Sequence, residues 1–331
     1  MYEILKESKF KNVPEWYING EIIEKNVLNT IKINVGKIPS HNRINIFAHV
    51  MDTGIPGPRI LLLAGIHGNE INGIETLRRV IEDKLYLKLS KGSLIIIPLL
   101  NVYGFINYSR DVLDGKDVNR SFPGHINGSL ASRIARIITK FILPEVDVAI
   151  DFHTGGEARY NYPQIRYNKN DQKALLLAQA AEVPFIIEQP LINHSFRKAA
   201  FDMHVPAIVF EGGESIRLSG KAIETGYQSI INILSKMEMM DRDMTLPRNS
   251  TILVKKTSWV RAAHAGLFIW KKQSGEFVKK GEILGHIKDP YGTFSYEVHA
   301  NQNGYIIGHN NASVVYLGDA LFHIGLDYSS L

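Results

Sequence analysis

Two histidines and one glutamate stand at positions in this sequence where they could hold a metal ion. His67 and Glu70 are three residues apart, and His153 lies far downstream. Two imidazoles and one carboxylate suit a zinc ion that keeps one coordination position open for water. An open position indicates hydrolysis, because zinc activates water and polarises a carbonyl group. The alternative for the first pair is a loop histidine and a helix glutamate that are merely exposed to solvent.

The segments around this pair indicate how its side chains would be positioned. Residues 59–65 form a short apolar run that ends in glycine, which predicts a buried strand. Apolar residues then recur at helical spacing over 71–85, so we expect a helix there. His67 would follow the end of the strand. Glu70 would lie in the first helical turn, where the helix dipole favours a carboxylate.

His153 has the same kind of placement. It follows directly after the apolar run 146–152, which predicts a second buried strand. Sites in open α/β sheets collect outside the carboxyl ends of the strands, so histidines at two such ends are expected to converge. Asp151 would face the same side of its strand as His153. It would be either a structural acid or a group that orients a neighbour.

Two further segments supply polar groups. Asp117, Asn119 and Arg120 stand close together before a Pro-Gly stop. Arginine offers a planar fork for a substrate carboxylate or a developing oxyanion. Glu211 leaves another apolar run, where a carboxylate beside a metal-bound water is well placed to be a general base. The alternative for Glu214, the other acid of that stretch, is a solvated loop residue, and Glu211 is the expected base because it lies closer to the strand.

These segments resemble, in their order and spacing, the motifs of the succinylglutamate desuccinylase/aspartoacylase family, which is related to the zinc carboxypeptidases. The resemblance covers about residues 55–235. The matching motifs are Gly-Ile-His-Gly-Asn-Glu at 65–70, Asp-Val-Asn-Arg-Ser-Phe-Pro-Gly at 117–124, Asp-Phe-His at 151–153 and Phe-Glu-Gly-Gly at 210–213. Four motifs in the right order are far more specific than any one of them.

The resemblance implies one zinc ion per chain, held by His67, Glu70 and His153, with Glu211 as the catalytic acid/base. Zinc lowers the pKa of its water to about 7. Glu211 would take the proton as that water attacks an amide carbonyl, and would then pass it to the departing amine. The implied fold is a zinc-carboxypeptidase-like α/β fold, in which helices flank a mixed sheet.

The same resemblance implies roles for four other residues. Asn119 and Arg120 would grip the substrate carboxylate. Asp117 would accept a hydrogen bond from the outer nitrogen of His67, the usual device for fixing a metal-bound imidazole. Arg110, nine residues before Asn119, would polarise the scissile carbonyl.

A stretch rich in arginine and tyrosine follows His153. Arg159, Tyr160, Tyr162 and Arg166 are expected to form a loop over the pocket. Arg159 and Arg166 would bind substrate there and select the acyl group or the amino-acid portion. The alternative is a tyrosine-rich loop that packs on the surface.

The chain is expected to contain two domains, a catalytic α/β domain at 1–243 and a β domain at 244–331. Apolar strands alternate with helical patterns in the first part, which is typical of an α/β layer fold. Short strands punctuated by glycine follow, which indicate a small all-β unit. That unit resembles a lipoyl/biotinyl-type barrel sandwich. It lacks the lysine that carrier domains have at the hairpin tip, so we expect a structural or lid role.

Composition restricts the partners. The chain has 331 residues, 45% of them hydrophobic, and no cysteine, so it can bury a large core but has no thiolate site. A net charge of +5 without a long basic run argues against a nucleic-acid partner. No run approaches the roughly 20 apolar residues of a membrane span, and the N-terminal segment lacks an apolar signal core. We expect a cytoplasmic protein with a small-molecule substrate, and a homo-oligomer is compatible with the sequence.

Three functions from different classes follow from these patterns. The first is a zinc amidohydrolase that acts on carbon–nitrogen bonds other than peptide bonds and cleaves an N-acyl amino acid or a related small amide. The second is a metallocarboxypeptidase that uses the same residues on a peptide C-terminus. The third is a binding protein without activity, which the complete set of ligands, base and arginines opposes.

Overall fold

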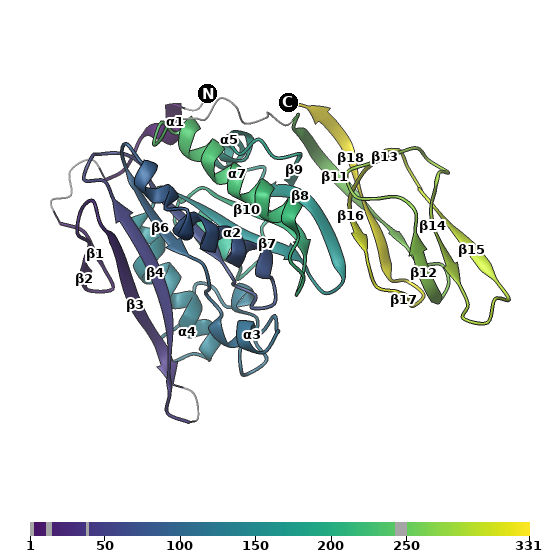
Figure 1. The fold of residues 1–331 in the computed structure, drawn as a ribbon, viewed down its shortest axis with the longest axis horizontal. Coiled ribbons are helices and arrows are strands. Elements are labelled where there is room, and N and C mark those ends of the chain that lie inside the picture. The colour runs from purple at the N-terminus through teal and green to yellow at the C-terminus, as the bar shows by residue number, and fades with distance from the viewer. Residues whose placement is uncertain (1–2, 11–14, 38–39, 242–249) are drawn as a thin grey trace.

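The computed structural model describes residues 3–10, 15–37, 40–241 and 250–331. Its main element is one twelve-stranded mixed sheet that runs through most of the molecule, with helices on both faces of its N-terminal part (Figure 1). None of the described helices is long and apolar enough to cross a lipid bilayer.

The large sheet begins at the edge strand β3 and ends at β13. In spatial order its strands are β3 (Leu28–Lys37), β4 (Arg43–Asp52), β6 (Ser93–Ile97), β5 (Arg59–Ala64), β7 (Val148–Gly155), β10 (Ala207–Glu214), β8 (Arg159–Tyr167), β9 (Phe185–Glu188), β11 (Ile252–Arg261), β18 (Ala320–Ser330), β16 (Gly304–Asn310) and β13 (Phe277–Val278). The central strands β6, β5, β7 and β10 are parallel, and β8 joins them antiparallel to β10. The expected α/β fold with a mixed sheet is therefore confirmed.

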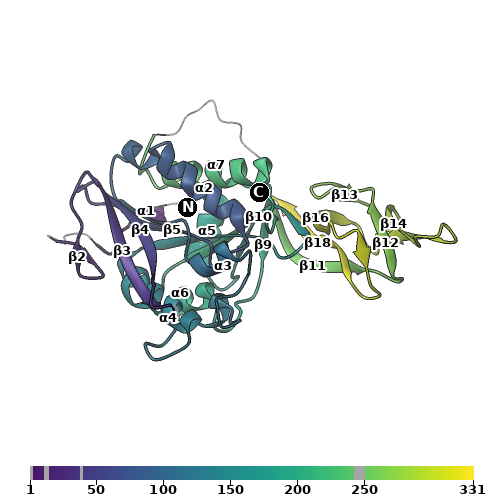
Figure 2. The same ribbon diagram turned by 60° about the horizontal axis from the view of Figure 1, so that its bottom comes forward.

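Helices cover both faces of this sheet in its N-terminal part. The α-helices are α1 (Glu3–Lys6), α2 (Ile71–Glu82), α3 (Val102–Ile106), α4 (Leu130–Ile137), α5 (Gln172–Ala180), α6 (Phe196–Asp202) and α7 (Gly220–Lys236). Short 3-10 turns cover Leu85–Lys88, Val118–Arg120 and Leu143–Glu145, and a π-helical turn covers Ile138–Ile142. Helices α2, α5 and α7 pack on one face, and α4 and α6 pack on the other (Figure 2).

The strand β5 shows why this arrangement follows from the sequence. All six of its residues are buried, because helices cover the sheet on both sides. Side chains alternate between the two faces of a strand. Ile60 and Leu62 accordingly join the core under α2 and α7, while Leu61 and Leu63 join the core under α4.

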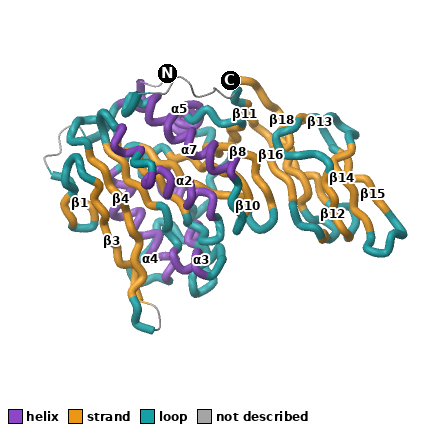
Figure 3. Tube along the Cα trace, viewed as in Figure 1, coloured by secondary structure: helices purple, strands orange, loops and turns teal. Residues whose placement is uncertain are grey.

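The C-terminal part of the described chain consists of strands alone (Figure 3). Besides β11, β13, β16 and β18, a separate four-stranded sheet contains β15 (Ser295–His299), β14 (Ile283–Lys288), β12 (Gly266–Trp270) and β17 (Val314–Val315). A small hairpin near the N-terminus pairs β1 (Tyr17–Ile18) with β2 (Glu21–Ile22). The C-terminal strands enclose their own apolar core around Phe268 and Phe322. The boundary expected between residues 243 and 244 lies outside the described residues.

The C-terminal strands continue the large sheet. β11 pairs parallel with β9, and β16 pairs antiparallel with β8. The expectation of a loop at Arg159–Arg166 is wrong, because these residues form β8. They pair with β10 on one side and with β9 and β16 on the other. Arg159, Asn161 and Arg166 of this segment line a cavity, so the segment lacks the alternation of apolar and polar residues that predicts a strand.

Candidate metal centre and substrate pocket

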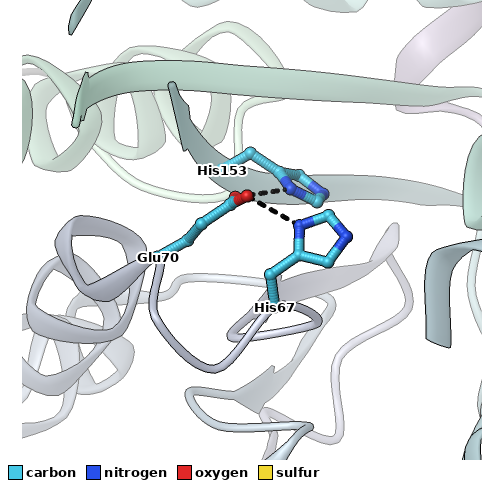
Figure 4. Close-up of side chains that lie close together, drawn as sticks. All are labelled: His67, Glu70 and His153. Atoms are coloured by element: carbon cyan, nitrogen blue, oxygen red, sulfur yellow. Dashed lines mark hydrogen bonds and ion pairs between the residues drawn. The ribbon is translucent and has the colours of Figure 1, made fainter. Parts of the chain in front are cut away.

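Three buried side chains from separate elements meet at the ends of the central strands (Figure 4). His67 lies in the turn after β5, Glu70 is the N-cap residue of α2, and His153 lies near the end of β7. Gly65, with a φ of +66°, takes the left-handed conformation in which the chain turns out of β5. The strand end and the helix start thus bring His67 and Glu70 to the same point.

The Glu70 carboxylate lies between the two imidazoles. Its Oε1 is 2.7 Å from Nδ1 of His67, and its Oε2 is 2.8 Å from Nδ1 of His153. One donor atom from each of the three residues lies within 4.8 Å of the others. That separation is close to what three ligands at about 2.0–2.2 Å from one ion require.

The outer nitrogens of both imidazoles face carboxylates. Nε2 of His67 is 3.2 Å from Asp117 Oδ1, and Nε2 of His153 is 2.7 Å from Asp151 Oδ2. A carboxylate on the outer nitrogen fixes the ring and leaves the inner nitrogen free for a cation. Asp151 therefore orients His153, which is one of the two roles expected for it. The expected contact between Asp117 and the outer nitrogen of His67 is present.

The charges of this cluster also suit a cation. Burial alone would raise the pKa of Glu70, but the two imidazoles outweigh it and hold that pKa well below its ordinary value. Burial alone would lower the pKa of His153, but Asp151 and Glu70 raise it well above the usual range. The Glu70 carboxylate is thus favoured in its ionised form between the two imidazole nitrogens, and a divalent cation would replace the protons that lie between these groups. The group could therefore hold a metal ion.

Arg110 lies at the rim of this cluster. Its Nη2 donates to Asp117 Oδ2 over 2.9 Å, and its Nη1 is 3.3 Å from Glu70 Oε1. Although burial opposes it, the contacts with His67 and Arg110 lower the pKa of Asp117. The Arg110 side chain stays 40% exposed, so its guanidinium is open to a substrate as well.

The cluster forms the floor of a cavity of about 530 Å³, a size that suits a small molecule. All the expected site residues except Asp117 line this cavity, and Asp117 contacts it through His67 and Arg110. Among the lining side chains that carry a charge, five are arginines: Arg110, Arg120, Arg159, Arg166 and Arg197. Carboxylates of the protein pair with Arg110, Arg159 and Arg166. Within the described part of the chain Arg120 and Arg197 have no such partner, so these two arginines favour an anionic ligand.

Glu211 reaches this cavity from the middle of β10, opposite His153 in the register of β7. Its Oε2 accepts a hydrogen bond of 2.9 Å from Asn161 Nδ2, and its Oε1 is 2.9 Å from Arg166 Nη1. Arg166, expected to bind substrate, thus has a carboxylate partner within the protein. Glu214 is not a solvated loop residue, because it is buried at the end of β10 and accepts from Asn311 Nδ2 over 2.6 Å.

The remaining expected substrate residues lie on the cavity wall. Oδ1 of Asn119 accepts from the backbone N–H of Phe196 over 2.8 Å, which leaves its amide NH₂ for a ligand. The Arg120 guanidinium donates to the backbone carbonyl of Asn119, and the side chain is exposed. Arg159 pairs with Glu157 at the mouth.

The lining residues that the sequence analysis did not predict include Asn161, Arg197 and Trp259. Arg197, on α6, is only 7% exposed, and among the described residues no carboxylate lies within salt-bridge distance of it. Its Nη2 donates to the carbonyl of Pro190, while its buried Nη1 has no partner. Burial, with the nearby Arg166, lowers its pKa to about 10. An unpaired buried guanidinium at a cavity is a group for an anion to bind.

Comparison with protein families gives one match, which covers more than half of the chain. A model of the succinylglutamate desuccinylase/aspartoacylase catalytic domain matches residues 56–237. These residues include every expected metal, base and substrate position named above.

A curated relative and several solved structures are similar over most of the chain. N-alpha-acetyl-L-2,4-diaminobutyric acid deacetylase from Halomonas elongata is 26% identical over 281 residues, which cover 80% of this chain and 81% of the relative. The crystal structure of succinylglutamate desuccinylase/aspartoacylase from Rhodobacter sphaeroides has a TM-score of 0.80 at 22% identity, covering 93% of this chain and 98% of that one. The product-bound ectoine utilization protein EutE from Ruegeria pomeroyi has a TM-score of 0.79 at 23% identity, covering 91% and 95%. The solved structures establish likeness of fold, including the C-terminal strands.

Proposed function

Because this chain belongs to the succinylglutamate desuccinylase/aspartoacylase family, we propose that it is a zinc-dependent hydrolase that cleaves the amide bond of an N-acyl amino acid or a related small amide. One observation carries the proposal. The buried group of His67, Glu70 and His153 shares a cavity with the acid Glu211 and with arginines suited to an anionic substrate.

His67, Glu70 and His153 would hold the zinc ion. When bound, zinc lowers the pKa of water to about 7 and polarises a carbonyl oxygen. Glu211 accepts the proton of the attacking water at its carboxylate and donates it to the departing amine nitrogen. Arg110, partly exposed beside the cluster, stabilises the negative charge that develops on the carbonyl oxygen.

The substrate carboxylate binds at the arginine-rich wall. The free amide NH₂ of Asn119 and the guanidinium of Arg120 are two of its contacts, and the unpaired Arg197 is the third. The deacetylase from Halomonas elongata supports a short acyl group and an amino acid as the two products. The β strands beyond residue 250 would form a barrel-sandwich domain beside the catalytic domain.

A substrate panel tests this function. We expect the zinc-loaded enzyme to hydrolyse N-acyl amino acids, including N-acetylated diamino acids, and to release the free amine. Short peptides with free C-termini and N-acyl amines without a carboxylate serve as the comparison sets. A kcat/KM for peptides above that for every N-acyl amino acid would assign the carboxypeptidase function instead. If the enzyme hydrolyses neither the N-acyl amino acids nor the peptides, the proposal is contradicted.

Replacing Arg197 with methionine should weaken binding of carboxylate-bearing substrates. A hydrogen bond to a charged group contributes about 1.5–3 kcal/mol, so we expect KM to rise by about 10- to 100-fold. Methionine can occupy the same space, and no carboxylate of the described residues pairs with Arg197 and would be left without a partner. Steady-state kinetics on an N-acyl amino acid and on its C-terminal amide would measure the effect.

The surface substitution Arg78→Met, on the outer side of α2, is the matched control. It should leave both KM values unchanged. An Arg197→Met enzyme with a wild-type KM for the carboxylate substrate would remove Arg197 from the substrate contacts.

A further inference from the structure

We infer that the C-terminal strands complete the active site by positioning the Glu211 carboxylate through Asn161. This inference rests on the proposed role of Glu211 as proton acceptor. It gives Asn161 and Gly308 positioning roles, and it gives the C-terminal strands a role in turnover.

Both oxygens of the Glu211 carboxylate are held by β8. Asn161 Nδ2 donates to Oε2, and Arg166 Nη1 contacts Oε1, each over 2.9 Å. Asn161 and Glu211 are 6% and 8% exposed, so water competes little for these contacts. A carboxylate bound at both oxygens cannot turn away from the reacting atoms. A general base must be held in this way, because small displacements cost large factors in rate.

The end of β8 that carries Asn161 is itself held by the C-terminal strand β16. Gly308, His309 and Asn310 pair with residues 161, 160 and 159 of β8. The other strand on this side, β9, pairs with β8 only from Gln164 onward. β16 therefore supplies the neighbour without which this end of β8 would be a free edge.

Two side-chain and loop contacts strengthen this pairing. Gln164 Nε2 donates to the carbonyl of Ile307 over 3.1 Å, and the backbone N–H of Asn311 donates to the carbonyl of Ala158 over 2.8 Å. The Asn311 side chain also reaches Glu214, at the end of the strand that carries Glu211. β16 is thus joined to both strands that form the base of the site.

Gly308 allows β16 to come this close. A Cβ atom at residue 308 would lie 3.0 Å from Asn161 Oδ1 and 3.0 Å from the carbonyl oxygen of Tyr160. Such a contact is tighter than nine in ten Cβ contacts in proteins, so with an alanine the Asn161 carboxamide and the Tyr160 backbone must give way by a few tenths of an ångström. A single methyl group added to β16 would then displace the side chain that donates to the Glu211 carboxylate.

The test uses Asn161→Leu and Gly308→Ala in the full-length, zinc-loaded enzyme. Leucine keeps the size of asparagine but lacks the donor, and we expect kcat to fall by about 100-fold with KM and zinc content close to wild type. Tm should fall slightly, because the buried Glu211 carboxylate loses one donor. Gly308→Ala should lower kcat by about 10-fold. In the Asn161→Leu background it should have no further effect, because both changes act through the same contact. Gly220→Ala, where an added Cβ meets no atom, is the matched control.

The outcomes separate this inference from the proposed function. Wild-type kcat in Asn161→Leu and Gly308→Ala, together with an inactive Glu211→Gln enzyme, would overturn the inference and leave the function intact. The inference would also be overturned if Gly308→Ala lowered kcat as much in the Asn161→Leu background as in the wild-type enzyme. Full turnover in Glu211→Gln would instead overturn the proposed function.

Discussion

Replacing Glu211 with glutamine is expected to lower kcat by about 100- to 10,000-fold while the protein keeps its metal. General acid–base catalysis by a positioned side chain contributes factors of that size. Glutamine has the shape of glutamate but cannot accept the proton. Its NH₂ group would face either Asn161 or Arg166, both donors, so a small loss of stability should accompany the change.

The measurement combines steady-state kinetics with the metal content of the same preparation. Glu224→Gln is the control, because Glu224 is an exposed residue of α7 that pairs with Arg79 and does not line the cavity. It should turn over substrate at nearly the wild-type rate. A Glu211→Gln enzyme with full activity would assign the base to another residue.

Replacing His153 with alanine should remove the metal itself. The change deletes one of three ligands and leaves the buried carboxylates of Glu70 and Asp151 facing an empty space. Loss of an outer partner alone typically lowers metal affinity or activity by about 10- to 100-fold. Loss of a ligand should exceed that, and turnover should disappear together with the metal.

The metal-to-protein ratio, measured by mass spectrometry of the purified variant, decides this case. The control is His125→Ala, an exposed histidine outside the cavity, which should keep the wild-type ratio. An unchanged ratio in His153→Ala would exclude His153 from the ligand set. His153→Ala should lose both the metal and turnover, whereas Glu211→Gln should lose turnover alone.

The core of the site could be predicted because its residues follow local signals. The runs 60–65, 148–150 and 207–210 are apolar throughout, and strands buried on both faces have this pattern. His67, His153 and Glu211 follow or end these runs, and parallel neighbours bring their carboxyl ends to one edge of the sheet. Neighbouring parallel strands β5, β7 and β10 place the three residues as that argument expects.

The other residues depend on contacts between distant parts of the chain. Arg166 looked like a substrate residue because its partner, Glu211, lies 45 positions away in the sequence and its position on β8 had no strand signal. Asn161 belongs to the same segment, whose outer neighbour β16 is far along the chain. Arg197 is a lone arginine on a short helix, and only burial without a carboxylate partner distinguishes it. Such features come from strand register and packing, which a single sequence does not show.

The central claim is that His67, Glu70 and His153 bind one zinc ion, and anomalous X-ray scattering at the zinc edge tests it most directly. Crystals of the protein purified with zinc should show one strong peak per chain. That peak should lie about 2.0–2.2 Å from Nδ1 of both histidines and from a Glu70 oxygen. Zinc bound at full occupancy elsewhere, with no peak among these three side chains, would contradict the account.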